Sequence, residues 1–143
     1  MARINGNDKD NTLRGTDGHD EIEGRGGDDR LFGRAGNDDL EGGAGKDILD
    51  GGSGRNDLEG GSGADVFIFR QGMTEIDDFG RGNDTVRIDR IDRALGVDNF
   101  DELMALAKSV DGGEDVLIDF GRHELRFEDT RMSDLKPSDF DFI

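Results

Sequence analysis

Acidic and amide side chains recur every nine residues through the first half of this chain, and their spacing could hold metal ions. The series comprises Asn11, Asp20, Asp29, Asp38, Asp47, Asn56 and Asp65. Carboxylate and amide oxygens are hard donors, and the pattern supplies no nitrogen or sulfur ligand. A donor set of this kind favours calcium over zinc or copper.

Glycines frame each of these side chains. One series stands five residues before the acidic or amide residue, at Gly6, Gly15, Gly24, Gly33, Gly42, Gly51 and Gly60. A second series stands two residues before it, at Gly18, Gly27, Gly36, Gly45, Gly54 and Gly63, with Lys9 in the first repeat. Glycine lets a turn direct its carbonyl oxygens inward. We therefore expect the carbonyls around the second series to bind the metal together with the side chains.

One large apolar residue follows each of these places by two residues, namely Leu13, Ile22, Leu31, Leu40, Leu49, Leu58 and Phe67. This pattern predicts a six-residue turn followed by a three-residue strand whose central side chain points inward. Two repeats would then form one coil, and parallel hydrogen bonds would stack successive coils about 4.8 Å apart. The predicted fold is all-β, a parallel β-roll.

Loops that lie two repeats apart would meet on the same edge of the roll. The odd edge carries Asn11, Asp29, Asp47 and Asp65, and the even edge carries Asp20, Asp38 and Asn56. One ion between each pair of neighbouring loops gives about five internal calcium sites. We expect the site between Asp29 and Asp47 to be the strongest because both side chains are charged, and the sites of Asn11 and Asn56 to be weaker.

The composition explains why a metal would be needed. The 143 residues carry a net charge of −17, with 37% charged residues, 31% hydrophobic residues and 24 glycines. Such a chain normally stays disordered, because little apolar area offsets its conformational entropy. Bound divalent ions would neutralise the carboxylates and couple folding to metal binding, so we expect disorder without calcium.

The same composition excludes several classes of function. A strongly acidic chain is a poor partner for nucleic acid or for an anionic membrane surface. The chain has no cysteine, which excludes disulfides and thiolate metal sites. The sequence shows neither the apolar run of a cleavable leader nor any segment apolar enough to span a bilayer.

The repeat G-G-x-G-x-D-x-(large apolar)-x resembles that of the RTX, or haemolysin-type calcium-binding, family. Residues 42–50 and 60–68 match it best. The first repeat, with Lys9 and Asn11, and the sixth, with Asn56, depart from it. The resemblance implies a calcium-bound parallel β-roll that holds several ions and is secreted.

Other interpretations of the glycine-rich half fit less well. A glycine-rich acidic linker or a silk-like β-stack would not need an aspartate at one place in nine. An EF-hand loop would need glycine where Leu13 stands, although Asp8 and Asp10 begin like one.

Past residue 69 the repeat ends, and we predict a roll over residues 1–69 followed by a cap over residues 70–143. Residues 75–86 partly echo the repeat, and the resemblance suggests that Asp77 and Asp84 hold a last ion, with solvated turn carboxylates as the alternative. Residues 99–110 predict a helix that begins with a capping box of Asn99 and Glu102. The next alternating segments, 115–120 and 124–128, predict a hairpin.

The last residues, 135–143, mix acidic and apolar side chains. RTX proteins carry an uncleaved C-terminal signal of this kind, which a type I exporter reads. A packed terminal strand is the plainer interpretation.

No catalytic residue set is evident. His19 and His123 stand at variable places typical of surface residues, and chance pairs are expected among 35 carboxylates. We therefore predict a non-enzymatic module that binds calcium, folds on binding it, and belongs to a type I-secreted extracellular bacterial protein. The alternative is an accessory or polysaccharide-binding module of a larger secreted enzyme, of the protease, lipase or alginate epimerase type. The basic segment formed by Arg81, Arg87, Arg90 and Arg93 interleaves with Asp84, Asp89 and Asp92, which indicates local ion pairs. Contact of this segment with an anion or a polysaccharide is the alternative.

Overall fold

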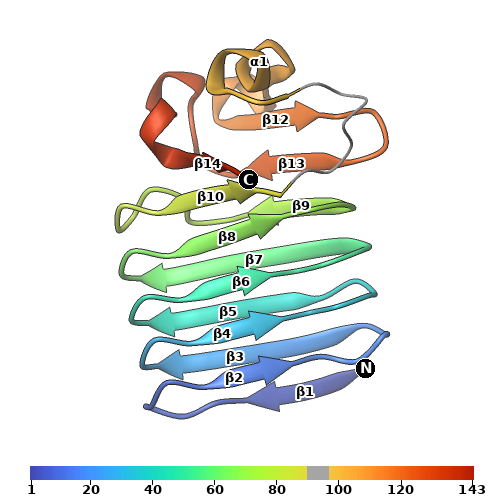
Figure 1. Ribbon diagram of the computed structural model, residues 1–143, viewed down its shortest axis with the longest axis vertical. Helices are drawn as coiled ribbons and strands as arrows, with labels where there is room; N and C mark the ends of the chain where they lie inside the picture. Colours follow the sequence, from blue (N-terminus) through green and yellow to red (C-terminus); the bar gives the residue numbers. More distant parts are fainter. Residues whose placement is uncertain (90–96) are drawn as a thin grey trace.

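The computed structural model describes residues 1–89 and 97–143, whose strands wind into a two-sheet solenoid (Figure 1). In spatial order, the eight-stranded sheet contains β1 (Ala2–Asn5), β3 (Asp20–Gly26), β5 (Asp39–Ala44), β7 (Arg55–Ser62), β9 (Met73–Ile76), β13 (Glu124–Phe127), β12 (Asp115–Asp119) and β11 (Ala107–Val110). The six-stranded sheet contains β14 (Phe140–Phe142), β10 (Thr85–Ile88), β8 (Val66–Phe69), β6 (Ile48–Asp50), β4 (Arg30–Phe32) and β2 (Thr12–Arg14). The predicted all-β parallel roll is confirmed.

The strand register confirms that one coil takes two repeats. Leu13 pairs with Leu31, and Ile22 pairs with Leu40, each eighteen residues further along. The described pairings from β1 to β8 are all parallel, and successive strands alternate between the two sheets. Each loop therefore lies directly against the loop two repeats earlier, and acidic residues of alternate repeats share an edge.

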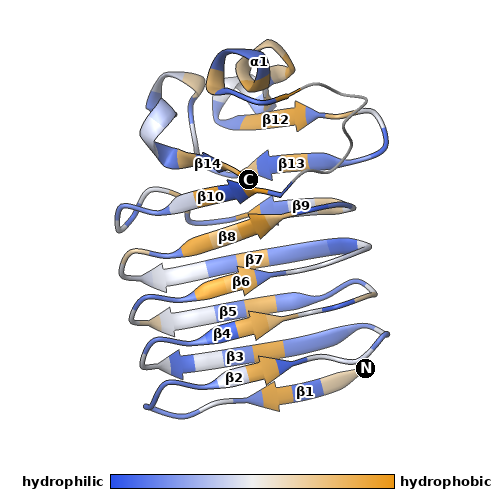
Figure 2. Ribbon diagram, viewed as in Figure 1, coloured by the Kyte–Doolittle hydropathy of each residue, from blue (hydrophilic) through white to orange (hydrophobic). Residues whose placement is uncertain are grey.

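The core of the roll is one column of apolar side chains on each sheet. The central residue of every repeat from Ile22 to Phe67 is at most 1% exposed. Figure 2 shows a short apolar segment in the mostly polar strands β3, β5 and β7, whereas β8 is apolar along its length. Leu13, in the first coil, is only partly buried. Full burial of one such side chain contributes about 1.5–3 kcal/mol. A column of one side chain per strand leaves the fold dependent on its loops as well.

The residues after the roll continue both sheets. β13 pairs in parallel with β9, and β14 pairs in parallel with β10. β12 pairs antiparallel with β13, which confirms the predicted hairpin, and β11 pairs antiparallel with β12. Short 3-10 turns lie at Asp111–Gly113, Met132–Asp134 and Pro137–Asp139. These additions cover strand edges that could otherwise pair with another chain.

The helix is shorter than the predicted 99–110 segment. α1 spans Phe100–Ala105, and residues 107–110 form β11. The cap at Asn99 is confirmed, because its side chain accepts a hydrogen bond from the N–H of Glu102 at 3.0 Å. A capping box would also require the carboxylate of Glu102 to accept from the N–H of Asn99. This carboxylate accepts instead from the N–H of Asp98. Pairing with β12 satisfies the backbone of residues 107–110, and this tertiary contact overrides a helical periodicity that is weak over so short a segment.

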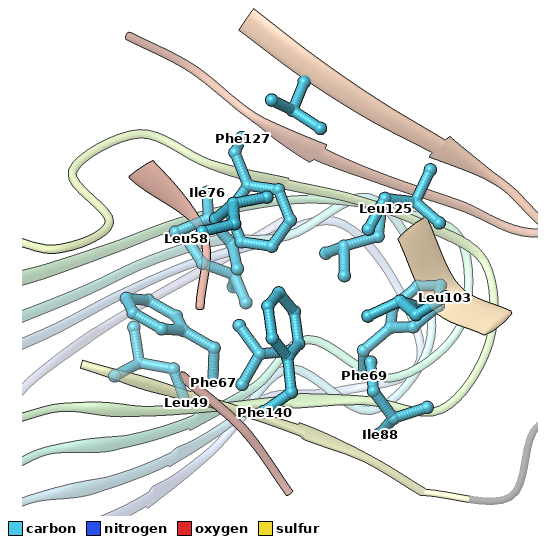
Figure 3. Close-up of a cluster of buried hydrophobic side chains, with 14 of the residues drawn as sticks. Leu49, Leu58, Phe67, Phe69, Ile76, Ile88, Leu103, Leu125, Phe127 and Phe140 are labelled. Atoms are coloured by element: carbon cyan, nitrogen blue, oxygen red, sulfur yellow. The ribbon is translucent and has the colours of Figure 1, made fainter. Parts of the chain in front are cut away.

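Aromatic rings join the cap to the roll (Figure 3). Phe79, between β9 and β10, meets Phe127 edge-on with ring centroids 4.9 Å apart, and Phe127 meets Phe140 at 6.1 Å. Phe69 at the end of β8 meets Phe120 at 5.4 Å. These rings belong to the same buried cluster as the apolar column of the roll, so roll and cap share one core.

Two arginines of the basic segment, Arg90 and Arg93, lie outside the described residues. In the part of the chain that the structure describes, no helix has the length and apolar character needed to cross a membrane.

Candidate metal sites on the two edges of the roll

Each edge of the roll carries a ladder of hydrogen bonds from the main chain to carboxylates. On the odd edge, the N–H of Asp29 donates to Oδ1 of Asp47 at 2.8 Å, and the N–H of Asp47 donates to Oδ1 of Asp65 at 2.9 Å. On the even edge, the N–H of Asp20 donates to Oδ1 of Asp38 at 2.9 Å. The structure thus brings together the side chains that the repeat places on each edge, one coil apart.

One oxygen in each of four ladder carboxylates has no hydrogen-bond partner among the described residues. These oxygens are Oδ2 of Asp29, Asp38, Asp47 and Asp65. Each of the four residues is at most 2% exposed, so bulk water does not solvate the oxygen. A buried carboxylate oxygen without a donor is costly unless a cation neutralises it.

A carbonyl oxygen of the next coil lies beside the unpartnered oxygen of Asp29, Asp38 and Asp47, as the surroundings of Gly42 show. A Cβ at Gly42 would lie 2.6 Å from Oδ2 of Asp47 and 2.7 Å from the carbonyl oxygen of Gly60, one coil further on. The same two kinds of oxygen converge beside Gly33 on the even edge. Two acceptors that converge from adjacent coils are the arrangement that a hard cation satisfies. The residues present therefore fit bound calcium.

The repeat pattern predicts that carbonyls of the second glycine series are ligands. These glycines lie where loops of adjacent coils contact each other. A Cβ at Gly36 would meet the carbonyl oxygen of Gly18 at 2.5 Å, and one at Gly27 would meet that of Lys9 at 2.9 Å. Sequence reasoning did not single out carbonyls of the first series, such as that of Gly60. Their approach to the carboxylates arises from stacking between coils, which no pattern within one repeat reveals.

At the second place of the repeat, arginine adopts the same loop conformation as glycine. That place has a φ of +102° at Gly43, and Arg25 in the preceding coil has a φ of +81°. Arg34, at the same place on the even edge, has a φ of +84°. A residue with a Cβ costs about 1–2 kcal/mol in this region. The surrounding loop must therefore enforce the conformation.

Burial raises the pKa values of the four ladder carboxylates that have an unpartnered oxygen. Burial raises the pKa of Asp47 to about 6, the N–H of Asp29 opposes this rise, and the carboxylates of Asp65 and Asp29 add to it. Burial also raises the pKa of Asp65 to about 6, and it raises the pKa values of Asp29 and Asp38. A cation between the coils would favour the charged form of all four side chains.

Three other ladder residues find partners within the protein. Oδ2 of Asp20 accepts from the N–H of Thr16 at 2.5 Å and from its Oγ1 at 2.9 Å, and that N–H is the main cause of the lowered pKa of Asp20. Oδ1 of Asn11 accepts from the N–H of Asn7 at 2.8 Å. The side chain of Asn56 bonds both to the preceding coil and to its own loop.

At the C-terminal end of the odd edge, two aspartates continue the pattern. Oδ1 of Asp84 accepts from the N–H of Asp65 at 3.0 Å. Asp78, which sequence reasoning missed, is buried, and its two oxygens accept from the N–H groups of Gly60 and Gly61 at 2.9 and 2.7 Å. The neighbouring pair of aspartates at 77 and 78 gave no signal as to which side chain would turn inward.

Asp77 lies elsewhere, beside Glu75 and Glu128. Carboxylate oxygens of these three half-buried residues lie within 4.8 Å of one another. Burial, followed by the charge of Asp57, raises the pKa of Asp77 to about 7. The structure therefore separates Asp77 from Asp84, although the sequence pattern groups them.

The remaining candidate residues hold structural contacts. His19 is exposed, and its Nδ1 lies against the carbonyl oxygen of Asn37. Nδ1 of His123 accepts a hydrogen bond from the N–H of Gly72 at 2.9 Å, which ties the cap to the roll. Arg87 in β10 pairs with a carboxylate of β14 at 3.5 Å.

Comparison with known proteins places the repeats in a family. A family model of RTX calcium-binding nonapeptide repeats matches residues 5–40 and 32–67. The chain is similar to the AlgE6R2 subunit of the Azotobacter vinelandii mannuronan C5-epimerase, with 29% identity over 97% of this chain and 91% of that chain and a TM-score of 0.48. It is also similar to the AlgE6R3 subunit of that epimerase, with 30% identity over 95% of this chain and 80% of that chain and a TM-score of 0.38.

A lipase shows a more distant similarity. The extracellular lipase LipA from Serratia marcescens is 14% identical over 96% of this chain and 39% of that chain, with a TM-score of 0.41. The chain thus spans well under half of the lipase. No curated protein matches it.

The family match falls on the loops that form the two ladders, and the 30% identity extends over nearly the whole chain. Repeats of this kind bind calcium, and the repeat module itself is not catalytic. The chain belongs to the family of RTX calcium-binding nonapeptide repeat proteins.

Proposed function

We propose that this chain is a calcium-responsive folding module of a secreted, extracellular protein, with a roll over residues 1–69 and a cap over residues 70–143. The observation that carries the proposal is the set of four buried carboxylate oxygens without donors, at Asp29, Asp38, Asp47 and Asp65. Calcium would supply the positive charge that these oxygens lack. Binding would then contribute directly to the free energy of folding, because the unfolded chain has no such sites.

The charge of the chain supports a role for calcium in controlling whether the chain folds, rather than in adding stability to a chain that is already folded. The chain has a net charge of −17, so its acidic side chains repel one another in any compact state unless cations bind. In a calcium-poor cell interior the chain would stay extended and competent for export. Outside the cell, calcium would drive folding.

Small-angle X-ray scattering tests this function. Without calcium, we expect a radius of gyration near that of an unfolded chain of this length, about 39 Å, and in millimolar calcium a value approaching about 15 Å for a compact fold. Magnesium at the same concentration is the control, because it requires near-ideal octahedral coordination and loses its water ligands reluctantly. A compact chain in the presence of chelator would contradict the proposal.

The route of export is a separate part of the proposal. We propose that residues 135–143 form a signal for a type I exporter, in keeping with the mixture of acidic and apolar side chains there. Phe140 pairs with Val86 in the folded state, so the segment would be accessible only before folding. Co-expression with a type I exporter should place the full chain in the medium and leave a chain truncated after residue 134 in the cell. Export of both chains would refute this role.

An accessory role in a larger secreted enzyme is the second candidate. It is favoured by the similarity to two epimerase subunits over nearly the full length of this chain. An anionic polysaccharide such as mannuronan would avoid the acidic outer residues of β3, β5 and β7 and would favour the face that carries Arg87. Affinity electrophoresis in calcium tests this role: retardation by the polysaccharide should be lost in Arg87→Ala and kept in Arg3→Ala. Equal migration with and without polysaccharide would exclude it.

A further inference from the structure

We infer that the first coil of the roll closes without calcium, through its own side chains, and that the calcium sites begin with the second coil. This inference rests on the calcium binding proposed above. It concerns the loops at residues 6–11 and 15–20, which occupy the same places in the repeat as the ion-binding loops that follow them.

Asp20 and Asp38 form a natural comparison. They lie on the same edge, at the same place in the repeat, one coil apart, and both are at most 2% exposed. Oδ2 of Asp38 has no partner among the described residues. Both oxygens of Asp20 are occupied, Oδ1 by the N–H of Ala2 at 2.8 Å and Oδ2 by the N–H and hydroxyl of Thr16. Both oxygens of Asp20 thus already accept hydrogen bonds, whereas one oxygen of Asp38 accepts none among the described residues.

The difference begins at the second place of the repeat. Arg34 and Gly52 hold that place in the next two coils of the even edge, and both have positive φ. Thr16 does not adopt that conformation. Its N–H lies 2.5 Å from the carboxylate of Asp20, and its hydroxyl adds a second donor at 2.9 Å. Thr16 thus donates hydrogen bonds to the oxygen that a calcium ion would otherwise contact.

The odd edge of the first coil is closed in a parallel way. The N–H of Asn7, at the second place of its repeat, donates to Oδ1 of Asn11 at 2.8 Å, and Oδ1 of Asn7 accepts from the N–H of Lys9 at 2.9 Å. Asn11 is neutral, so no charge is left to balance. Both loops of the first coil are therefore satisfied by short-range hydrogen bonds.

Two consequences follow for calcium loading. The ions would lie at Asp29, Asp47 and Asp65 on the odd edge and at Asp38 on the even edge, where the unpartnered oxygens are. The first coil would act as an ion-independent end of the array, in keeping with the atypical terminal units that repeat proteins need. Its ladder donors, the N–H groups of Asp20 and Asn11, bond to Oδ1 of Asp38 and of Asp29 and so offer the second coil a formed surface.

Counting bound ions by native mass spectrometry at saturating calcium chloride tests the inference. Asp20→Asn should bind the same number of calcium ions as the unchanged chain, and the matched variant Asp38→Asn should bind one fewer. Loss of an ion from Asp20→Asn would overturn the inference, because Asp20 would then be a ligand. Absence of calcium from the unchanged chain would instead overturn the proposed function itself.

A gain of binding provides the second arm. Thr16→Gly restores the glycine that the repeat has at Gly43, Gly52 and Gly61, removes the hydroxyl and permits positive φ. With a positive φ at residue 16, Oδ2 of Asp20 would be left without a donor, as Oδ2 of Asp38 is, and the variant should bind one ion more than the unchanged chain. The double variant Thr16→Gly/Asp20→Asn should return to the original number. A Thr16→Gly chain that folds in calcium without an additional ion would refute the role of Thr16.

Discussion

The N–H of Asp29 donates to Oδ1 of Asp47 at 2.8 Å, while Oδ2 of Asp47 lies beside the carbonyl oxygen of Gly60 without a donor. The carboxylate of Asp47 thus accepts a hydrogen bond from the coil before it through one oxygen and faces a carbonyl oxygen of the coil after it through the other. The first contact forms from protein atoms alone. The second is repulsive until a cation lies between the oxygens.

Replacing Asp47 separates these two contacts. Asp47→Asn keeps an acceptor for the N–H of Asp29 but removes the charge, so we expect the loss of one calcium ion. If calcium is 1,000-fold above the Kd of that site, the loss costs about 4 kcal/mol of folding stability. Urea denaturation in calcium measures the cost, with Asp39→Asn, on an exposed strand position, as control. Equal midpoints for the two variants would show that Asp47 binds no ion.

A second prediction concerns the strained conformation of Arg25. Arg25→Gly should stabilise the folded chain by about 1 kcal/mol, because glycine adopts a φ of +81° without the steric cost of a Cβ. The ion pair with Glu23, at 3.5 Å and largely exposed, contributes little. Arg30→Gly, within β4, is the matched control and should destabilise. Denaturation at saturating calcium compares the two; destabilisation of both by the same amount would contradict the account.

The pKa values of Asp47 and Asp65 predict how the calcium-free chain responds to acid. Both pKa values are raised from 3.8 to about 6 in the fold, so the folded state binds more protons than the unfolded state. The stability that these groups contribute is present below pH 3.8 and is lost as the pH rises to about 6. Without calcium, β structure should therefore be greater at about pH 4.5 than at about pH 7.5. The Asp47→Asn/Asp65→Asn variant should lose much of this difference; an unchanged difference would exclude these two groups as its source.

The shared aromatic core predicts that the cap stabilises the roll. Phe127 is fully buried against Phe79 and Phe140, so Phe127→Ala should cost about 3–5 kcal/mol. Phe142→Ala, at a half-buried place in β14, should cost less. Hydrogen exchange in calcium would show whether β8 loses protection together with β13. Loss of protection in β13 alone would mean that roll and cap unfold separately.

The roll could be predicted from the sequence because its information lies within one repeat. Glycine, aspartate and a large apolar residue at constant intervals specify the turn, the ligand and the strand, and the eighteen-residue register follows. The same pattern could not show that Asp20 is satisfied and Asp38 is not, because that difference depends on hydrogen bonds from Thr16. Interactions that break the repeat are the ones that the repeat cannot predict.

The cap was harder to predict because non-local pairing decides its structure. Residues 107–110 continue the apolar periodicity of α1, yet they pair with β12. Asp77 and Asp78 are adjacent and chemically identical, and only the approach of Gly60 and Gly61 makes Asp78 the buried partner. Both outcomes depend on residues that lie five or more places away along the chain.

A calcium titration followed by far-ultraviolet circular dichroism shows whether the roll needs calcium to fold. In the proposed function a cation neutralises the four ladder oxygens that lack donors, so the calcium-free chain at neutral pH should lack a β signal. The signal should appear cooperatively as calcium reaches millimolar concentrations, and chelator should abolish it. A β signal of the same strength with and without chelator would contradict the claim that calcium holds this fold together.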